Sequence, residues 1–345
     1  MQQRLTKLWY RDAASLSPLQ PLSWLYGAAI RLRRGAYTRG WLPTHRVGKS
    51  VVVVGNLTVG GTGKTPLVIW LARQLTDQGL QVGIVSRGYG SQSQEEPRVV
   101  NSESDWREVG DEPLLLVRAT GCATVVGHNR VAAALALVAR KVDVVIADDG
   151  LQHLRLARDC EIVVIDGARG FGNGRLLPAG PLREPVSRLA TADLIVVNGA
   201  MEHSSLRSVG VPIEAKALQM TLVPGKALRL DGQDHPRPLE DFRGRPVHAV
   251  AGIGNPERFF RDLRARGLDV IEHPFADHHP LAPQDLSFAD HLPVLMTEKD
   301  AVKCVSFTNP RLWSIPTAAV FGEAQARELL SYVLRKIECG SNVGG

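Results

Sequence analysis

The chain has 345 residues, of which 44% are hydrophobic and 22% are charged, and its formal net charge is +6. This composition is ordinary for a folded soluble chain, and the length leaves room for two domains. The four cysteines lie far apart without a C-x-x-C pair, so the sequence argues against a disulfide framework and a zinc site and fits a reducing cytosol.

The positive charge is concentrated at the N-terminus. Residues 1–50 hold nine Lys or Arg against one acid, together with three of the six tryptophans. Apolar residues recur at helical spacing over 22–30, and an arginine cluster follows at 31–34. This aromatic and cationic mixture suits a lipid headgroup layer, so residues 1–48 are predicted to form a membrane-interface helical segment that binds an anionic membrane surface.

Two other roles remain open for this segment. It can pack on the domain with its arginines solvated, or it can bind nucleic acid, although nothing downstream resembles a nucleic-acid module. No run reaches the ~18–20 apolar residues of a spanning helix. Pro18 and Pro21 interrupt the apolar stretch and no convincing cleavage site follows, which argues against a secretory signal.

A glycine-rich loop follows the apolar run 51–54, which is typical of a buried strand, and precedes the helical pattern 66–75. This order predicts a phosphate-binding loop, because backbone N–H groups and the helix dipole attract an anion there. Lys64 adds a mobile charge, and the Thr65 hydroxyl can ligate Mg²⁺. The predicted nucleotide-binding residues are Thr58, Val59, Gly60, Gly61, Thr62, Gly63, Lys64 and Thr65.

The loop departs from the general motif G-x-x-x-x-G-K-[ST] in one place. Thr58 stands where the first glycine is expected, so a plain glycine turn is the alternative interpretation. Val59 stands where ATPases of the membrane-partitioning type carry a lysine, which disfavours that subfamily.

Strand and helix patterns then alternate along the chain. Short Val- and Ile-rich runs at 81–85, 142–147, 161–166 and 192–197 are typical of parallel strands covered on both faces. The predicted fold class is α/β: a P-loop NTPase-like doubly wound parallel sheet with a second, smaller α/β domain, joined by a two-segment extended linker. The predicted boundaries are 1–48 for the N-terminal segment, 49–217 for the P-loop core, 218–232 for the linker and 233–345 for the C-terminal domain.

The second unit has a predicted strand at 247–251, a helix near 256–266 and a strand at 269–272. Gly252 and Gly254 lack the third glycine of a dinucleotide fingerprint, so they indicate a strand-to-helix turn. The TEKD sequence that begins at Thr297 superficially resembles a guanine-reading motif, but its Lys and Asp are adjacent and the spacing fails.

Asp148 and Asp149 close the apolar strand that precedes them. An acid at the C-terminal end of a strand beside a phosphate loop is where a Mg²⁺ ligand is needed, and Mg²⁺ needs only one or two carboxylates besides a hydroxyl and phosphate oxygens. Turn chemistry is the alternative for an isolated Asp-Asp pair. The pattern predicts Thr65, Asp148 and Asp149 as metal ligands.

Two further acidic sequences attract notice. Asp111, in the GDEP sequence at 110–113, by itself indicates a helix N-cap. The Asp-His-His sequence at 277–279 resembles a metal cluster, but adjacent histidines cannot readily face one ion from a regular element. A catalytic or solvent-facing histidine is the preferred interpretation.

Eight sequence blocks, in order along nearly the whole chain, together resemble the tetraacyldisaccharide 4'-kinase family, the lipid A kinases. Eight ordered blocks are far more specific than a lone phosphate loop, and the basic, aromatic N-terminus also matches. The blocks are GNLTVGGTGKTP (55–66), SRGYG (86–90), GDEP (110–113), DDGLQH (148–153), LPAGPLREP (177–185), AGIG (251–254), FADH (275–278) and TEKDAVK (297–303).

The resemblance implies Mg²⁺-dependent transfer of the ATP γ-phosphate to the 4'-hydroxyl of a tetraacyl disaccharide 1-phosphate at the cytoplasmic face of the inner membrane. It also implies that Asp111 is the catalytic base and His278 its partner, while Lys64 stabilises the phosphoryl group. Asp111 and His278 fall in different predicted domains, so closure about the linker would complete the site. Candidates for binding the substrate phosphate or the ATP phosphates are Arg87, Arg130 and Arg183.

Two other functions remain open. A membrane-recruited nucleotide-switch ATPase would turn over ATP without a lipid acceptor, and a cytosolic small-molecule kinase would have a core-packed N-terminus. The lipid kinase needs the lipid A disaccharide precursor as its partner, and the sequence indicates no nucleic-acid partner and no obligate protein partner.

Overall fold

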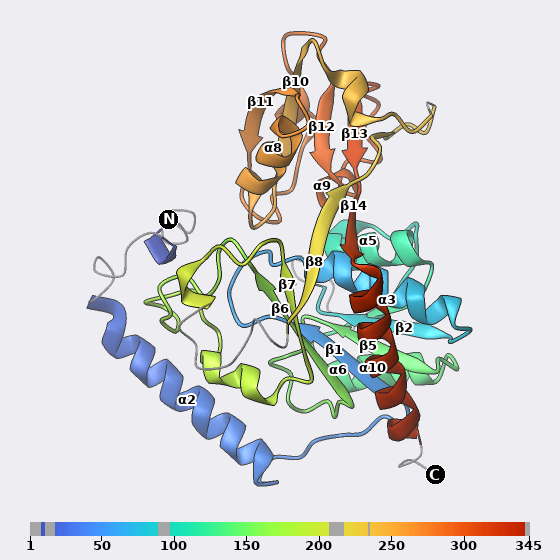
Figure 1. The fold of residues 1–345 in the computed structure, drawn as a ribbon. Coiled ribbons are helices and arrows are strands. Elements are labelled where there is room, and N and C mark those ends of the chain that lie inside the picture. Colours follow the sequence, from blue (N-terminus) through green and yellow to red (C-terminus); the bar gives the residue numbers. More distant parts are fainter. Residues whose placement is uncertain (1–7, 11–17, 89–96, 207–216, 234, 342–345) are drawn as a thin grey trace.

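The computed structural model describes residues 8–10, 18–88, 97–206, 217–233 and 235–341 (Figure 1). Two β-sheets with their helices form a larger and a smaller unit, and a long N-terminal helix, α2 (Gln20–Thr38), lies along the outside of the larger one. Parts of two sequence predictions, the basic residues Arg4, Lys7 and Arg11 and the last two residues of the block at 86–90, lie outside the described residues.

The larger sheet has nine strands within the described residues, in the order β14-β8-β7-β6-β1-β5-β2-β4-β3. Neighbouring strands are parallel except at the two edges, where β14 pairs with β8 and β3 pairs with β4 in antiparallel fashion. The central β1 lies between β5 and β6. The strands are β1 (Ser50–Gly55), β2 (Val82–Ser86), β3 (Arg98–Val100), β4 (Ala123–Val126), β5 (Val144–Asp148), β6 (Cys160–Asp166), β7 (Leu194–Asn198), β8 (Ala217–Pro224) and β14 (Thr317–Phe321).

Helices cover both faces of this sheet, which explains why its central strands are continuous apolar runs. One face packs against α3 (Lys64–Asp77), α5 (Asp111–Thr120) and α10 (Glu323–Ser341). The other face packs against α6 (Arg130–Val138) and the irregular segments that follow β5 and β6. The short α4 and the 3-10 turns of this unit are Trp106–Val109, Val186–Thr191 and Ser204–Leu206.

The smaller unit holds a five-stranded sheet, in the part of the chain that the structure describes, with the order β11-β10-β12-β13-β9. A core around Phe242, Phe260 and Trp313 fills one of its faces. Its elements are β9 (Leu228–Arg229), β10 (Pro246–Ala251), α8 (Pro256–Arg264), β11 (Asp269–Pro274), β12 (Val294–Thr297), α9 (Glu298–Ala301) and β13 (Leu312–Ile315), with 3-10 turns at Leu239–Phe242 and Pro283–Leu286. The α/β class with a P-loop NTPase-like sheet is therefore confirmed.

The structure corrects the predicted linker and C-terminal boundary. β8 belongs to the larger sheet and β9 to the smaller one, so the two extended segments are strands rather than a free linker. Figure 1 shows the chain returning through β14 to the larger unit, where β14 pairs with β8 and α10 packs on β1. A continuous C-terminal domain over 233–345 is thus wrong at its end. The pairing of β14 with β8 joins residues far apart in the sequence, so no local pattern predicts it.

A buried ion pair lies at the base of β6. Glu161 accepts hydrogen bonds from Arg188, which also contacts Glu184, and both partners are nearly inaccessible to water. Removing one partner of such a pair leaves a desolvated charge without compensation. The exposed pair between Arg327 and Glu323 on α10 has the same chemistry without the burial.

We expect Arg188→Met to lower the free energy of unfolding by about 3–5 kcal/mol, because the buried Glu184 loses its cation and Glu161 keeps only Arg158. The control Arg327→Met is expected to change it by less than about 1 kcal/mol, since water screens exposed pairs. Urea denaturation of both variants measures the difference. Equal losses would contradict the role assigned to burial.

Candidate active site

The glycine-rich loop leaves the end of β1 at the centre of the larger sheet and enters α3. Gly60 and Gly63 have φ angles of 108° and 96°, which a residue with a side chain rarely adopts. Two buried amides hold the loop: Asn56 Nδ2 donates to Thr58 O over 2.8 Å, and Asn198 Nδ2 donates to Thr62 O over 2.9 Å. Neither asparagine was predicted as a site residue from the sequence, although each is a polar residue at the end of a parallel strand.

Lys64 is the first residue of α3 and its side chain is mostly buried. Its Nζ lies 3.2 Å from Asn56 Oδ1 and 3.5 Å from Asp149 Oδ1. Glycine turn, helix N-terminus and lysine are therefore gathered as an anion site requires.

The two strand-end aspartates have different surroundings. Asp148 pairs in register with Val54 at the end of β1, and its Oδ2 accepts a hydrogen bond from Ser86. Its buried Oδ1 has no hydrogen-bond partner among the described residues. Burial, together with the nearby charge of Glu112, raises the pKa of Asp148 to about 7.

Asp149 is held by cations. Arg183 Nη1 donates to both of its oxygens, over 2.9 and 3.1 Å, and Lys64 lies against one of them. Burial favours the neutral acid, but the charges of Lys64 and Arg183 outweigh it and hold the pKa of Asp149 well below its usual range. Both of its oxygens are engaged.

The donor set fits Mg²⁺. An ionisable oxygen that is buried and without a partner gains strongly from a cation, and Asp148 provides one at the strand end beside the phosphate loop. The Thr65 hydroxyl stands on the first turn of α3. No group of three acidic, histidine or cysteine ligands occurs within the described ranges, and Mg²⁺ bound with phosphates needs no such cage.

The sequence context of Asp111 suggested a helix N-cap, but Asp111 is not the capping residue in the structure. Gly110 takes the N-cap position, and Asp111 is the first residue of α5, almost completely buried. Both of its oxygens accept from His278 Nδ1 over 3.0 Å. Burial favours the neutral acid, but this hydrogen bond and the charges of Lys299 and Lys303 lower the pKa of Asp111 to about 2.

His278 reaches Asp111 from the smaller unit. Its φ of 60° lies in the left-handed region, and its backbone N–H donates to Gly252 O. Burial opposes the charged imidazole, but the hydrogen bond to Asp111 outweighs this effect and raises the pKa of His278. His279 turns to a different partner, Asp285, so the adjacent histidines do not face one ion.

The turn after β10 contacts the phosphate loop. A Cβ added to Gly254 would lie 2.6 Å from Gly61 N, so the backbones meet as closely as a glycine allows. Arg169 Nη1 donates to Gly254 O, and Arg258 Nη2 donates to Asn198 Oδ1. The smaller unit therefore rests directly on the loop and on the asparagine that holds it.

The three candidate arginines lie in different settings. Arg183 is paired with Asp149, and Arg130 is buried with its Nη1 donating to backbone carbonyls at Ser86 and Gly127. Arg87 is exposed at the end of β2. Burial and the charges of Arg130 and Arg87 lower the pKa of His153 to about 4, so these cations gather near one imidazole.

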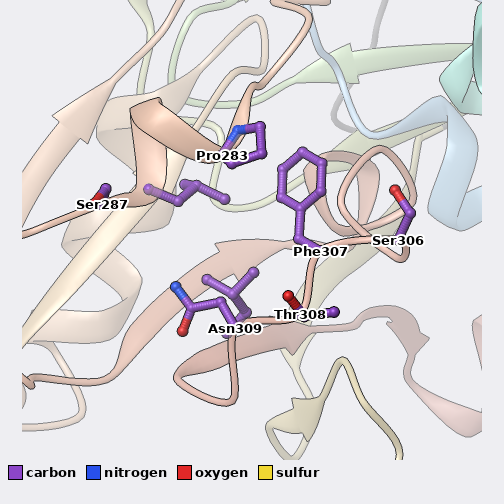
Figure 2. Close-up of a pocket in the computed structure, with 8 residues that line it drawn as sticks. Pro283, Ser287, Ser306, Phe307, Thr308 and Asn309 are labelled. Atoms are coloured by element: carbon purple, nitrogen blue, oxygen red, sulfur yellow. The ribbon is translucent and has the colours of Figure 1, made fainter.

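A pocket of about 250 Å³ lies elsewhere, in the smaller unit (Figure 2). Pro283 and Phe307 point toward each other across it, and its other lining residues are uncharged. It includes none of the residues that the sequence predicts for the site. The phosphate loop and the contacts around Asp111 are therefore the candidate active site.

The chain resembles one family throughout. The family described as Tetraacyldisaccharide-1-P 4'-kinase matches residues 16–335. The chain is 48% identical over 337 residues to the tetraacyldisaccharide 4'-kinase of Nitrosococcus oceani, covering 96% of each chain. It is 50% identical over 327 residues to that of Alkalilimnicola ehrlichii, covering 94% of each. The solved structure of LpxK from Aquifex aeolicus in complex with ATP matches with a TM-score of 0.77 and 29% identity, over 93% of this chain and 99% of that one.

We expect Asp148→Asn to raise the melting temperature of the metal-free protein at about pH 8 and to have a much smaller effect near pH 4. Asp148 titrates at about 7 when folded but near 3.9 when unfolded. Between these values only the folded state holds the proton, so stability falls as the pH rises through this window. Asparagine cannot ionise and escapes that loss.

Asp149→Asn is the control of opposite sign for a thermal melt at both pH values. Its carboxylate has a lowered pKa, so its stabilisation is present above the unfolded pKa, and its removal is expected to lower the melting temperature at both. A pH-independent effect of Asp148→Asn would contradict the burial of an ionisable group.

Proposed function

Because the chain belongs to the tetraacyldisaccharide-1-P 4'-kinase family, we propose that it transfers the ATP γ-phosphate to the 4'-hydroxyl of a tetraacyldisaccharide 1-phosphate at the cytoplasmic face of the inner membrane. ATP and Mg²⁺ are its cofactors. The contact between Asp111 and His278, made beside a phosphate loop, is the observation that carries the proposed chemistry.

The loop residues bind the nucleotide. Backbone N–H groups at 60–65 face the phosphates, and Lys64 exchanges its contacts with Asn56 and Asp149 for phosphate oxygens. Thr65 and Asp148 would hold Mg²⁺, which would supply positive charge to offset the charge of the phosphoryl group. Asp149 then keeps the two hydrogen bonds that Arg183 donates to it.

Asp111 accepts the proton of the 4'-hydroxyl. Its lowered pKa keeps it ionised at neutral pH, as a base requires. His278 donates its Nδ1–H to the carboxylate and so orients it and stabilises its charge. The family match favours this kinase over a nucleotide switch without an acceptor.

Assembly of the site depends on the smaller unit. His278 and Gly254 both belong to that unit, and they meet Asp111 and Gly61 of the larger one. We infer that closure of the two units completes the site and excludes water from the phosphoryl group. Arg87, as the exposed arginine of the three candidates, is assigned to the substrate phosphate.

The N-terminal helix supports attachment to a membrane surface. α2 packs on the larger unit through small residues: Ser23 Oγ donates to Leu176 O, and Gly27 makes a close approach to the Leu176 side chain. Its large apolar side chains face outward, the reverse of a core-packed helix. The exposed fractions of these side chains, and of Trp41 just after the helix, are Leu22 53%, Trp24 68%, Leu25 69%, Leu32 75% and Trp41 74%.

Charge and length agree with an interfacial position. Arg31, Arg33 and Arg39 are exposed on or just after the same helix, where they meet anionic headgroups. Within the described ranges, every helix is too short or too polar to cross a membrane. We therefore assign α2 to the headgroup layer, where it brings the site to a lipid substrate.

Asp111→Ala and His278→Ala are each expected to lower kcat by roughly 10²-fold or more, because proton transfer loses its base or the base loses its orientation. The double variant should be little slower than the slower single one, since groups that act together are non-additive. Transfer of labelled phosphate from ATP to the disaccharide lipid measures the rates. His279→Ala, which alters the adjacent histidine, is the control and should stay near wild type. Multiplicative losses would contradict the pairing.

The triple variant Trp24→Ser/Leu25→Ser/Trp41→Ser should bind anionic vesicles roughly tenfold or more weakly, since each buried apolar side chain contributes about 1.5–3 kcal/mol. Sedimentation with vesicles measures binding, and nucleotide binding in solution should be unchanged. Leu135→Ser/Val305→Ser removes exposed apolar residues outside α2 and is the matched control. Equal pelleting of wild type and triple variant would overturn the membrane assignment.

A further inference from the structure

The proposed reaction assigns no role to the TEKDAVK sequence at 297–303. It begins at the end of β12, where Thr297 caps the short α9. Asp300 is completely buried, and its Oδ2 accepts from Thr297 Oγ1 over 2.6 Å and from Gly252 N over 2.8 Å. The Gly252 carbonyl in turn accepts from the backbone of His278. The motif is therefore built into the turn that carries the histidine.

Lys303 is the unusual member of this group. Its side chain is 0% exposed, and its Nζ donates to Asp300 Oδ1 over 2.9 Å and to His279 O over 3.1 Å. The same Nζ lies 3.5 Å from Asp111 Oδ2, across the boundary between the two units. A buried ammonium needs a compensating charge, and Asp300 already provides one within the smaller unit. The contact with Asp111 is additional.

Lys299 has different partners. It donates to Glu112 over 2.9 Å and to Asp277 over 3.0 Å, at the more exposed rim of the boundary. Its Nζ is 3.3 Å from His278 Nε2, so it faces the histidine rather than the base. Of the two lysines in the motif, Lys303 is the one in direct contact with Asp111.

We propose that Lys303 is a positioning residue for phosphoryl transfer: held by Asp300 and the His279 carbonyl, its ammonium fixes the carboxylate of Asp111 in the orientation from which it accepts the proton of the acceptor hydroxyl. This role rests on the proposed function of Asp111 as the base.

The geometry around the carboxylate explains why one more cation matters. Asp111 Oδ1 accepts from Glu112 N over 2.8 Å, His278 Nδ1 donates to both oxygens, and Lys303 lies on Oδ2. Donors on both oxygens prevent the carboxylate from rotating. Without Lys303, Oδ2 keeps only the shared histidine and can turn away from the hydroxyl. The loss then falls on proton transfer and not on ATP binding.

Lys303→Met tests the contact but leaves Asp300 buried without its cation, which is destabilising by itself. Asp300→Asn/Lys303→Met removes both charges, and asparagine keeps an oxygen to accept from Gly252 N. We expect the double variant to recover most of the melting temperature lost in Lys303→Met. Its kcat should stay roughly tenfold to a hundredfold below wild type, the size of effect that misplacing a catalytic group causes, with KM for ATP within about threefold.

The pH profile of kcat separates positioning from packing. Removing a neighbouring cation raises the pKa of a carboxylate, so the acidic limb should move to higher pH in both Lys303 variants. Lys336→Met, which breaks the ion pair between Lys336 on α10 and Asp193, is the control and should leave kcat and the profile unchanged.

Two outcomes overturn the inference, and they are distinguishable. A double variant with recovered melting temperature, wild-type kcat and an unmoved acidic limb would show that Lys303 serves only to hold the fold. If Asp111→Ala itself retained kcat, the assignment of the base would fail, and with it the role of Lys303. Slow turnover in Asp111→Ala and in the stable double variant supports the proposal.

Discussion

The hydrogen bonds from His278 to Asp111 join the two units at the point where the phosphate loop leaves β1. They form only when the smaller unit rests on the larger one, an approach that Gly254 permits by presenting no side chain to Gly61. Lys303 arrives with His278, because both are tied to the turn at Gly252. The orientation of Asp111, the proposed base, therefore depends on the contact between the two units.

Three aspartates in this region differ in charge because their neighbours differ. Asp111 contacts His278 and Lys303 and lies near the charge of Lys299, and Asp149 contacts Arg183 and Lys64, so both have a lowered pKa. Asp148 meets a serine hydroxyl on one oxygen, and burial raises its pKa to about 7. Environments that give neighbouring carboxylates different pKa values are typical of catalytic sites. Here they separate the proposed proton acceptor Asp111, a partner of cations and a carboxylate suited to bind a metal ion.

The N-terminal helix distributes its apolar and small residues in the opposite way to the core. The central strands bury continuous Val and Ile runs, whereas α2 turns Ser23 and Gly27 inward and presents tryptophan and leucine to the outside. An apolar surface beside arginines has its lowest free energy at a boundary between lipid and water. A kinase whose acceptor carries acyl chains can meet that acceptor without removing it from the bilayer.

The sequence by itself determined the phosphate loop, β1, α3 and the α/β class, because turn chemistry and apolar runs are local properties of neighbouring residues. It also indicated Asp148, since an acid at a strand end beside such a loop has few other uses. The fold as a whole decided what local patterns could not. The local pattern alone indicated an N-cap at Asp111; the family resemblance implied its pairing with His278, 167 residues away, and the fold supplies the contact. Asn198 and Lys303 acquired partners only through packing. Contacts between residues far apart along the chain exist only once the strands have ordered and the two units have met.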